Sequence, residues 1–188
     1  TTTERDPKQS PAPDLVKRKF SAERLNQLWV ADMTYLPTWC GFLYLAVVID
    51  VYSRKVVGWA FGEQMTADLV INALNMALQM RQPSGVIHHS DQGSQYGSDD
   101  WKRFCAANNL EPSMSRRGNC WDNAVAESFF KTIKTEELDR YQPLKANTLN
   151  SLVFKYIEGW YNTQRIHSSL DGKTPWETFF EKYLTLAA

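Results

Sequence analysis

The sequence predicts an α/β fold in which a mixed five-stranded sheet is flanked by helices. Three β-rich segments, 28–36, 42–50 and 54–62, are joined by short polar connections, which is typical of an antiparallel meander. Beyond them the hydrophobic spacing becomes helical, and short strands then alternate with helices. A meander followed by β/α alternation indicates a mixed sheet with helices on both faces.

The later elements follow from helix caps and hydrophobic spacing. In chain order, we expect a helix from Thr66 to Arg81, a strand at 86–89, a helix from Ser98 to Ala107, a strand at 112–115 and a helix over 122–138. Apolar residues between Leu149 and Tyr161 recur at i, i+3, i+4 and i+7, which indicates an amphipathic helix. The segment Thr174-Pro175-Trp176-Glu177 has the pattern of a capping box, so one more helix is expected there.

Composition divides the chain into three parts. Residues 1–24 contain prolines and charges without periodicity, so we expect a linker. Residues 25–140 carry the sheet and form the predicted core domain, and residues 141–188 form a helical extension of that core. The longest apolar run, between Gly41 and Tyr52, is too short to span a bilayer, so no membrane partner is expected.

Bulk charge and cysteine usage narrow the classes of function. Lys plus Arg total 21, as do Asp plus Glu, and this balance by itself counts against a nucleic-acid partner. The objection is partial, because a metal-dependent nuclease needs carboxylates and its basic residues can cluster locally. The cysteines, Cys40, Cys105 and Cys120, form no C-x-x-C pair, which disfavours a disulfide framework or a zinc cluster and favours a reducing, intracellular setting.

Three carboxylates occupy unusual positions. Asp32 lies in the middle of an apolar strand, where an unpaired charge is costly. Asp91 comes just after the strand 86–89, and functional sites in α/β sheets gather at strand ends. Glu127 lies inside the helix 122–138. Taken singly, each has a structural explanation as well: a salt bridge, a stabilised turn or a solvated helix position.

Glu127 shares one stripe of its helix with Asn123, Lys131 and Lys134, at the spacing i, i+4, i+8 and i+11. Three carboxylates held close together would repel one another, and divalent cations would relieve that repulsion. All-oxygen ligation favours Mg²⁺ or Mn²⁺ over Zn²⁺. Two such ions about 3.5–4 Å apart can promote an in-line displacement at phosphorus. The lysines of the stripe would then meet the phosphate backbone.

The surrounding sequence carries several motifs in a fixed order. They are WVADMTY (29–35), VIDVYSRKVVGW (48–59), HHSDQGSQY (88–96), SMSRRGNCWDNAVAESFFKTIK (113–134) and YNTQRIHSSLDGKTP (161–175). With 35 residues between Asp91 and Glu127, this set resembles the integrase-type catalytic core of bacterial insertion-sequence transposases of the insertion-sequence-three family, which are relatives of retroviral integrases. The resemblance covers the chain roughly from Leu28 to Phe179.

The resemblance implies a ribonuclease-H-like fold in which Asp32, Asp91 and Glu127 are both the catalytic residues and the metal ligands. It implies hydrolytic nicking of DNA and then strand transfer, in which a freed 3′-hydroxyl attacks a phosphodiester. Two Mg²⁺ or Mn²⁺ ions per site are expected when DNA is bound. The implied setting is the bacterial cytoplasm. Because each DNA end needs an active site, we expect a homo-oligomer, at least a dimer on DNA.

Candidate DNA contacts surround the three acids. The full set is Lys131, Lys134, Arg116, Arg117, Asn119, Asn123, Gln95, Arg165 and His167. Lys134 matches the basic residue that the resembled enzymes place near the terminal DNA bases. The loop around Gly118 leads directly to Glu127, which favours contact with DNA. Arg165 and His167 either bind DNA or brace the terminal helices.

Two other functions stay open on the sequence alone. One is a nuclease of the same fold that only hydrolyses DNA, since water and a 3′-hydroxyl occupy the same nucleophile position. The other is a catalytically silent DNA-binding or assembly module.

Three polar residues near the predicted site are expected to have mainly structural roles. Asp50 ends a strand before a turn and is expected to bond local backbone groups. Of His88 and His89, one is expected to be a structural hydrogen-bonding residue, and the other is a candidate for contact with metal or phosphate.

Overall fold

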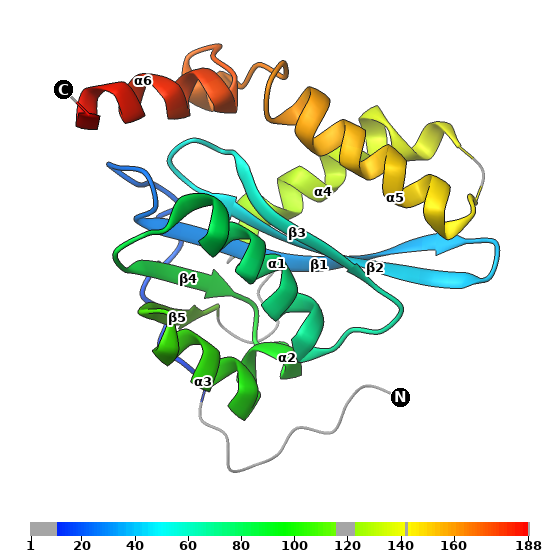
Figure 1. The fold of residues 1–188 in the computed structure, drawn as a ribbon, viewed down its shortest axis with the longest axis horizontal. Helices are drawn as coiled ribbons and strands as arrows, with labels where there is room; N and C mark the ends of the chain where they lie inside the picture. The colour runs from blue at the N-terminus through cyan, green and yellow to red at the C-terminus, as the bar shows by residue number, and fades with distance from the viewer. Residues whose placement is uncertain (1–10, 116–122, 142, 188) are drawn as a thin grey trace.

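The computed structural model describes residues 11–115, 123–141 and 143–187, and Figure 1 shows their arrangement. Within these ranges the strands form one five-stranded sheet in the order β3-β2-β1-β4-β5. Its members are β1 (Leu28–Thr38), β2 (Gly41–Asp50), β3 (Val56–Gly62), β4 (Val86–Ser90) and β5 (Leu110–Met114). The pairs β1–β2 and β2–β3 are antiparallel, whereas β1–β4 and β4–β5 are parallel. The predicted mixed sheet is confirmed.

Helices cover both faces of this sheet (Figure 1). Helices α1, α2 and α3 pack against one face, and α4, α5 and η3 pack against the other. The helical elements are α1 (Ala67–Arg81), α2 (Ser94–Gly97), α3 (Asp99–Ala107), α4 (Ala124–Glu136), η2 (Leu138–Arg140), α5 (Ala146–Phe154), η3 (Lys155–Tyr161), η4 (Ser168–Leu170) and α6 (Pro175–Ala187). None of the described helices combines the length and the apolar composition needed to cross a bilayer.

Side chains from the two faces of β1 belong to two separate hydrophobic clusters. Trp29 and Ala31 belong to the cluster beneath α1 and α3, and Leu28 and Val30 belong to the cluster beneath α4. Successive side chains of a strand point to opposite faces. The alternation therefore places Asp32 on the α4 side of the sheet, directly after two fully buried apolar residues.

Local sequence signals set most helix starts correctly. The side chains of Thr66 and Ser98 accept hydrogen bonds from the first turns of α1 and α3. At α6, Thr174 N donates to Glu177 Oε2 at 2.8 Å and Glu177 N donates to Thr174 Oγ1 at 3.1 Å, which confirms the predicted capping box. The short helix α2 was not predicted from the sequence.

Two predicted elements differ from the structure for backbone reasons. The strand expected over 54–62 begins at Val56, because Arg54 has a φ of 59°, in the left-handed region that strands do not use. The helix expected up to Tyr161 changes at Lys155 to the wider π form. This wider winding ends at Asn162, whose side chain accepts from Val56 N at 2.9 Å and donates to Val56 O at 3.0 Å.

The described part of the predicted linker lies against the sheet. Val16 is buried, Pro13 O accepts a hydrogen bond from Met114 N on the edge strand β5, and the Phe20 ring contacts His89. The boundary at residue 24 stays a prediction.

Glycine at position 58 allows α1 to lie directly on β3. A Cβ at this residue would collide with the backbone oxygen of Ala73 and would lie 2.9 Å from Ala77 N. We expect Gly58→Ala to lower the free energy of unfolding by about 2–3 kcal/mol, because the helix must move off the sheet.

Urea denaturation measures this change, and Gly159→Ala is the matched control because a Cβ there meets nothing within 4 Å. The control should be neutral or slightly stabilising. Equal losses of stability in both variants would contradict the close-packing explanation.

Candidate active site

Two neighbouring parallel strands bring Asp32 and Asp91 side by side. In the ladder between β1 and β4, Val30 is paired with His89. Because both strands run in the same direction, continuing this register by two residues sets Asp32 level with Asp91. Neighbouring strands lie about 4.8 Å apart. Asp32 on β1 therefore lies beside the end of β4, which Asp91 directly follows, although the two residues are 59 positions apart in the chain.

Helix α4 is fastened to β1 on both sides of Asp32. Asn123 Nδ2 donates to Ala31 O at 3.1 Å, and Lys134 Nζ donates to Thr34 Oγ1 at 2.8 Å. Glu127 lies between these two anchors on the same stripe of the helix. The stripe predicted from its spacing thus faces β1 at both ends, and it directs Glu127 toward Asp32.

The three acids are close enough for their charges to act on one another. Burial raises the pKa of Asp32 from 3.8 to about 7. The nearby charges of Asp91 and Glu127 add to this rise, and a hydrogen bond from Met33 N opposes it. Asp32 therefore holds a proton up to near neutral pH when no cation is present.

Asp91 is held by the turn that follows β4. Gly93 N donates to Asp91 Oδ1 at 2.9 Å. A Cβ at residue 93 would lie 2.9 Å from the same oxygen and 2.8 Å from Oε1 of Gln95. Glycine at this position therefore lets the turn close around the carboxylate without displacing it.

A buried aromatic cluster lies behind the two aspartates. The rings of Tyr96 and Trp101 meet edge to face at 5.4 Å, and His88 lies 4.8 Å from Trp101. Burial, together with the charges of Asp32 and Asp91, raises the pKa of Tyr96 well above its usual value. The Tyr96 hydroxyl is buried and has no hydrogen-bond partner among the described residues. The Tyr96 hydroxyl therefore stays neutral within the electrostatic field of Asp32 and Asp91.

The donor chemistry of the three acids suits a hard divalent cation, since carboxylate oxygens are the ligands that Mg²⁺ and Mn²⁺ prefer. In the described part of the chain, no three His, Cys, Asp or Glu side chains form a ready-made metal site. The three acids are therefore close enough for their charges to interact, but they do not form a preformed metal site among the described residues. Burial first, and the charges of Asp91 and Glu127 in addition, raise the pKa of Asp32, and a bound cation would favour its ionised form.

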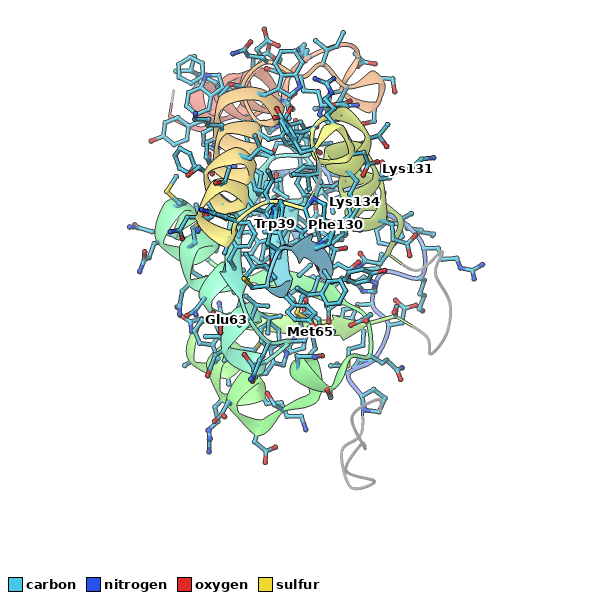
Figure 2. All side chains as sticks on the ribbon, turned by 90° about the vertical axis from the view of Figure 1, so that its right-hand side faces the viewer. Trp39, Glu63, Met65, Phe130, Lys131 and Lys134 are labelled. Carbon is cyan, nitrogen blue, oxygen red and sulfur yellow. The ribbon has the colours of Figure 1, made fainter. Side chains whose placement is uncertain are left out.

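The predicted DNA contacts fall into four groups, of which the first three are these. Lys131 is exposed and points outward from α4, whereas Lys134 points back toward the body of the protein (Figure 2). Asn123 and Gln95 are buried and use their amides internally, Asn123 on Ala31 O and Gln95 on Met65 O at 2.9 Å. The other predicted loop contacts lie outside the described residues; they are Arg116, Arg117 and Asn119.

Arg165 and His167 make contacts within the protein. Arg165 forms a two-pronged ion pair with Glu136, with its Nε and Nη2 atoms 2.9 and 2.8 Å from Oε1. The His167 ring packs edge to face on Tyr161 at 5.0 Å. These contacts brace the terminal helices, one of the two roles expected, and DNA contact by the same residues stays a prediction.

The residues with expected structural roles behave accordingly. The buried Asp50 accepts hydrogen bonds from Asn26 N and from both the backbone and the hydroxyl of Ser53. His89 Nδ1 and Ser113 Oγ are 2.8 Å apart, so His89 is the structural hydrogen-bonding histidine. His88 is enclosed by aromatic rings.

The sequence analysis missed Thr34 and Tyr96. Thr34 lies two residues beyond Asp32 on the same face of β1, so strand alternation alone could have placed it in the site. Tyr96 gave no such signal, because α2, which carries it, was not predicted.

The sequence matches two models of known protein families. A family model described as integrase core domain matches residues 22–120, more than half of the chain, and a second model of the same description matches residues 108–175. The chain belongs to the integrase core domain family. The resemblance to integrase-type cores is confirmed. Asp32 and Asp91 lie in the first matched segment, and Glu127 lies in the second.

Bacterial insertion elements supply similar proteins. An uncharacterized 31 kDa protein of insertion element IS600 from Shigella sonnei is 47% identical over 178 residues, which are 94% of this chain and 65% of that protein. The transposase for element IS904 from Lactococcus lactis is 46% identical over 91% of this chain and 67% of its own length. Transposase InsF for IS3A from Escherichia coli K12 is 45% identical over 91% of this chain and 59% of its own. The chain thus spans about two thirds or less of these relatives.

Solved retroviral integrases have the same fold. A chain of the simian T-cell lymphotropic virus intasome, solved with the PP2A regulatory subunit B56 gamma, superposes over 93% of this chain and 60% of its own, with a TM-score of 0.71 and 18% identity. The HTLV-2 integrase catalytic core in complex with magnesium, in its trimeric form, gives a TM-score of 0.65 at 20% identity over 85% of this chain and 99% of its own. The predicted ribonuclease-H-like fold is therefore confirmed.

The pKa of Asp32 makes the stability of the metal-free protein depend on pH. Between 3.8 and about 7 the folded state binds more protons at Asp32 than the unfolded chain does, so stability falls as pH rises through this window. We expect Asp32→Asn to be more stable than the unsubstituted protein at pH 8, by about 2–5 °C in Tm, because Asn removes the buried charge.

Thermal melts in EDTA at pH 8 and pH 3 measure this difference, which should vanish at the lower pH. Asp99→Asn, an exposed acid on α3, is the control and should show no such pH-dependent gain. A variant at residue 32 that is less stable at pH 8 would contradict the assignment of a desolvated carboxylate.

Proposed function

We propose that this chain is the catalytic domain of a DDE transposase, which cleaves DNA strands and then joins a freed 3′-hydroxyl to a phosphodiester. The proposal depends above all on the parallel register that sets Asp32 level with Asp91, with the charge of Glu127 acting on the same carboxylate. The names of two similar proteins, both transposases of insertion sequences, support it.

Asp32, Asp91 and Glu127 are the proposed metal ligands. When bound, a pair of Mg²⁺ or Mn²⁺ ions would neutralise charge at the phosphorus and make the attacking hydroxyl easier to deprotonate. Asp32 has to lose its proton before it can act as a ligand, so metal binding should weaken as pH falls below about 7. The buried hydroxyl of Tyr96 has no hydrogen-bond partner among the described residues, and its raised pKa keeps it protonated in the field of the two aspartates.

Lysines on α4 are the proposed contacts to the DNA backbone. Lys131 is exposed one turn beyond Glu127 and is free to reach a phosphate. Lys134 lies nearer the carboxylates, because its ammonium group is held by Thr34 and lies 5.4 Å from the ring centre of Tyr35. Arg116, Arg117 and Asn119, in the segment that leads into α4, complete the proposed DNA surface.

The proposed working form is at least a dimer on DNA, in the bacterial cytoplasm. Each of the two DNA ends of a mobile element needs a set of carboxylates of its own. Solved structures of HTLV-2 integrase cores include dimeric and trimeric forms, which shows that this fold supports assemblies.

Strand joining distinguishes a transposase from a nuclease. Transesterification is reversible, and its reverse needs no recognition of a terminal sequence. The chain should therefore be incubated with Mg²⁺ and a branched oligonucleotide that imitates the joined product. Release of one arm with resealing of the other strand is the expected result. Cleavage by water without resealing would indicate a hydrolytic nuclease, and an inert protein would indicate a silent assembly module.

Substitution of Asp91 by Asn, or of Glu127 by Gln, should reduce this reaction at least ~100-fold while the fold is retained. The rates are measured under single-turnover conditions, with circular dichroism as the check on folding. Asp99→Asn is the control that removes an equivalent charge away from the site. Full activity in Asp91→Asn would exclude the carboxylate mechanism.

A further inference from the structure

A second polar cavity lies on the flank of α4, separate from the carboxylates. It has a volume of about 500 Å³, and helix α4, the segment at Phe20 and the chain around η4 enclose it. Its polar groups come from Arg54, Arg165, His167, Ser128, Thr132 and Ser168. No Asp or Glu is among the described residues that line it. The cavity therefore presents two guanidinium groups and several hydroxyls without a carboxylate.

Among the described residues, Arg54 is the cation of this cavity that has no carboxylate partner. Burial lowers the pKa of its guanidinium, and only the nearby Tyr161 and Asp50 offset this effect. It makes no salt bridge with any carboxylate in the described ranges. Its backbone adopts the left-handed conformation before β3, which fixes where the side chain starts. A half-buried guanidinium without an anion is costly, and an anionic ligand would remove that cost.

Arg165 and His167 are fixed on the opposite wall. The ion pair with Glu136 holds the Arg165 side chain in place. Burial, followed by the charges of Arg165 and Arg54, lowers the pKa of His167 to about 4, so the imidazole is neutral at physiological pH. Its Nε2 atom is buried without a hydrogen-bond partner in the part of the chain that the structure describes. A neutral imidazole can carry its proton on this nitrogen and donate it to an anionic oxygen.

We propose that this cavity binds a phosphate group, held by the Arg54 guanidinium, the imidazole of His167 and the hydroxyls of α4 and η4. Guanidinium forks and hydroxyls suit the several oxygens of a phosphate better than they suit a single-atom anion such as chloride. Ser128 follows Glu127 directly in α4, and the cavity lies about a quarter of a turn around that helix from the catalytic stripe. A DNA strand crossing α4 would therefore offer a backbone phosphate to it. Only this choice of DNA as the source depends on the proposed function.

Arg54→Gln tests the proposal, because it removes the charge without removing a salt bridge. DNA affinity is measured by fluorescence anisotropy on a labelled mixed-sequence duplex, in EDTA and over a range of salt concentrations. We expect an affinity loss of about 5- to 30-fold and a salt slope that is shallower by about 0.9, since one phosphate contact is lost. The melting temperature should be unchanged or higher. Arg103→Gln on α3 is the matched control and should leave both DNA readouts unchanged.

Two further measurements decide the chemistry and the source of the phosphate. Ser168→Asp places a carboxylate in the cavity and should cause the same loss of DNA affinity, by pairing with the guanidinium groups.

Inorganic phosphate is added alone while the imidazole nitrogens of His167 are followed by NMR. A shift that Arg54→Gln abolishes, together with the weaker DNA binding, supports a site for the DNA backbone. The same shift with unchanged DNA binding supports a site for free phosphate.

The proposal is overturned if neither probe responds to Arg54→Gln, or if Arg103→Gln changes DNA binding as much. It is also overturned if Arg54→Gln lowers the melting temperature and has no effect on phosphate or DNA, since Arg54 would then be structural. These experiments contain no divalent cation. DNA binding in these experiments, combined with no strand joining in the separate Mg²⁺ assay on the branched oligonucleotide, would refute the transposase assignment and leave the phosphate site standing.

Discussion

The parallel pairing of β1 with β4 is the constraint on which the rest of the site depends. It alone sets Asp91 level with Asp32, because no local sequence relation connects the two residues. Helix α4 adds the third carboxylate only because it is fastened to the same strand, at Ala31 by Asn123 and at Thr34 by Lys134. Both anchors flank Asp32 within two residues. The geometry of the site is therefore set by β1, which pairs with β4 along its edge and is bonded to Asn123 and Lys134 on either side of Asp32.

Burial of Asp32 close to the other carboxylates lowers the stability of the folded protein. The apolar core around β1 offsets this loss. The raised pKa of Asp32 shows that an ionised carboxylate is unfavourable at this position. The neighbouring residues Trp29, Val30 and Ala31 are almost completely buried and hold the strand in place regardless. A site that is destabilised when empty favours the ligand that neutralises it, which is how a metal-dependent enzyme couples cation binding to order.

Much of this arrangement could be predicted from the sequence, because its signals are local or carried by motifs. The meander, the caps at Thr66 and Ser98 and the stripe through Glu127 each depend on residues within a few positions of one another. The inward use of Asn123 and Gln95 could not be predicted, because their partners, Ala31 and Met65, are far away in the chain.

The same limit applies to the backbone irregularities. The hydrophobic stripe over Leu149–Tyr161 has α-helical spacing, so it gave no sign of the change to the π form at Lys155. The flank cavity was beyond prediction for a related reason. Arg54 lies before β3, whereas Ser128 belongs to α4 and His167 follows η3, so only the tertiary fold brings these polar residues to one place.

The side chain of Asn162 links the last third of the chain to the sheet. It bonds both backbone groups of Val56, and the residues before it, Leu149 to Tyr161, contribute one wall of the core behind α4. The C-terminal helices are thus part of the scaffold on which Glu127 is mounted. A copy of the gene with a stop codon at position 162 would still encode Asp32, Asp91 and Glu127. Its product would nonetheless lose the Asn162 side chain that ties this wall of the core to β3, and with it part of the support of the helix that carries Glu127.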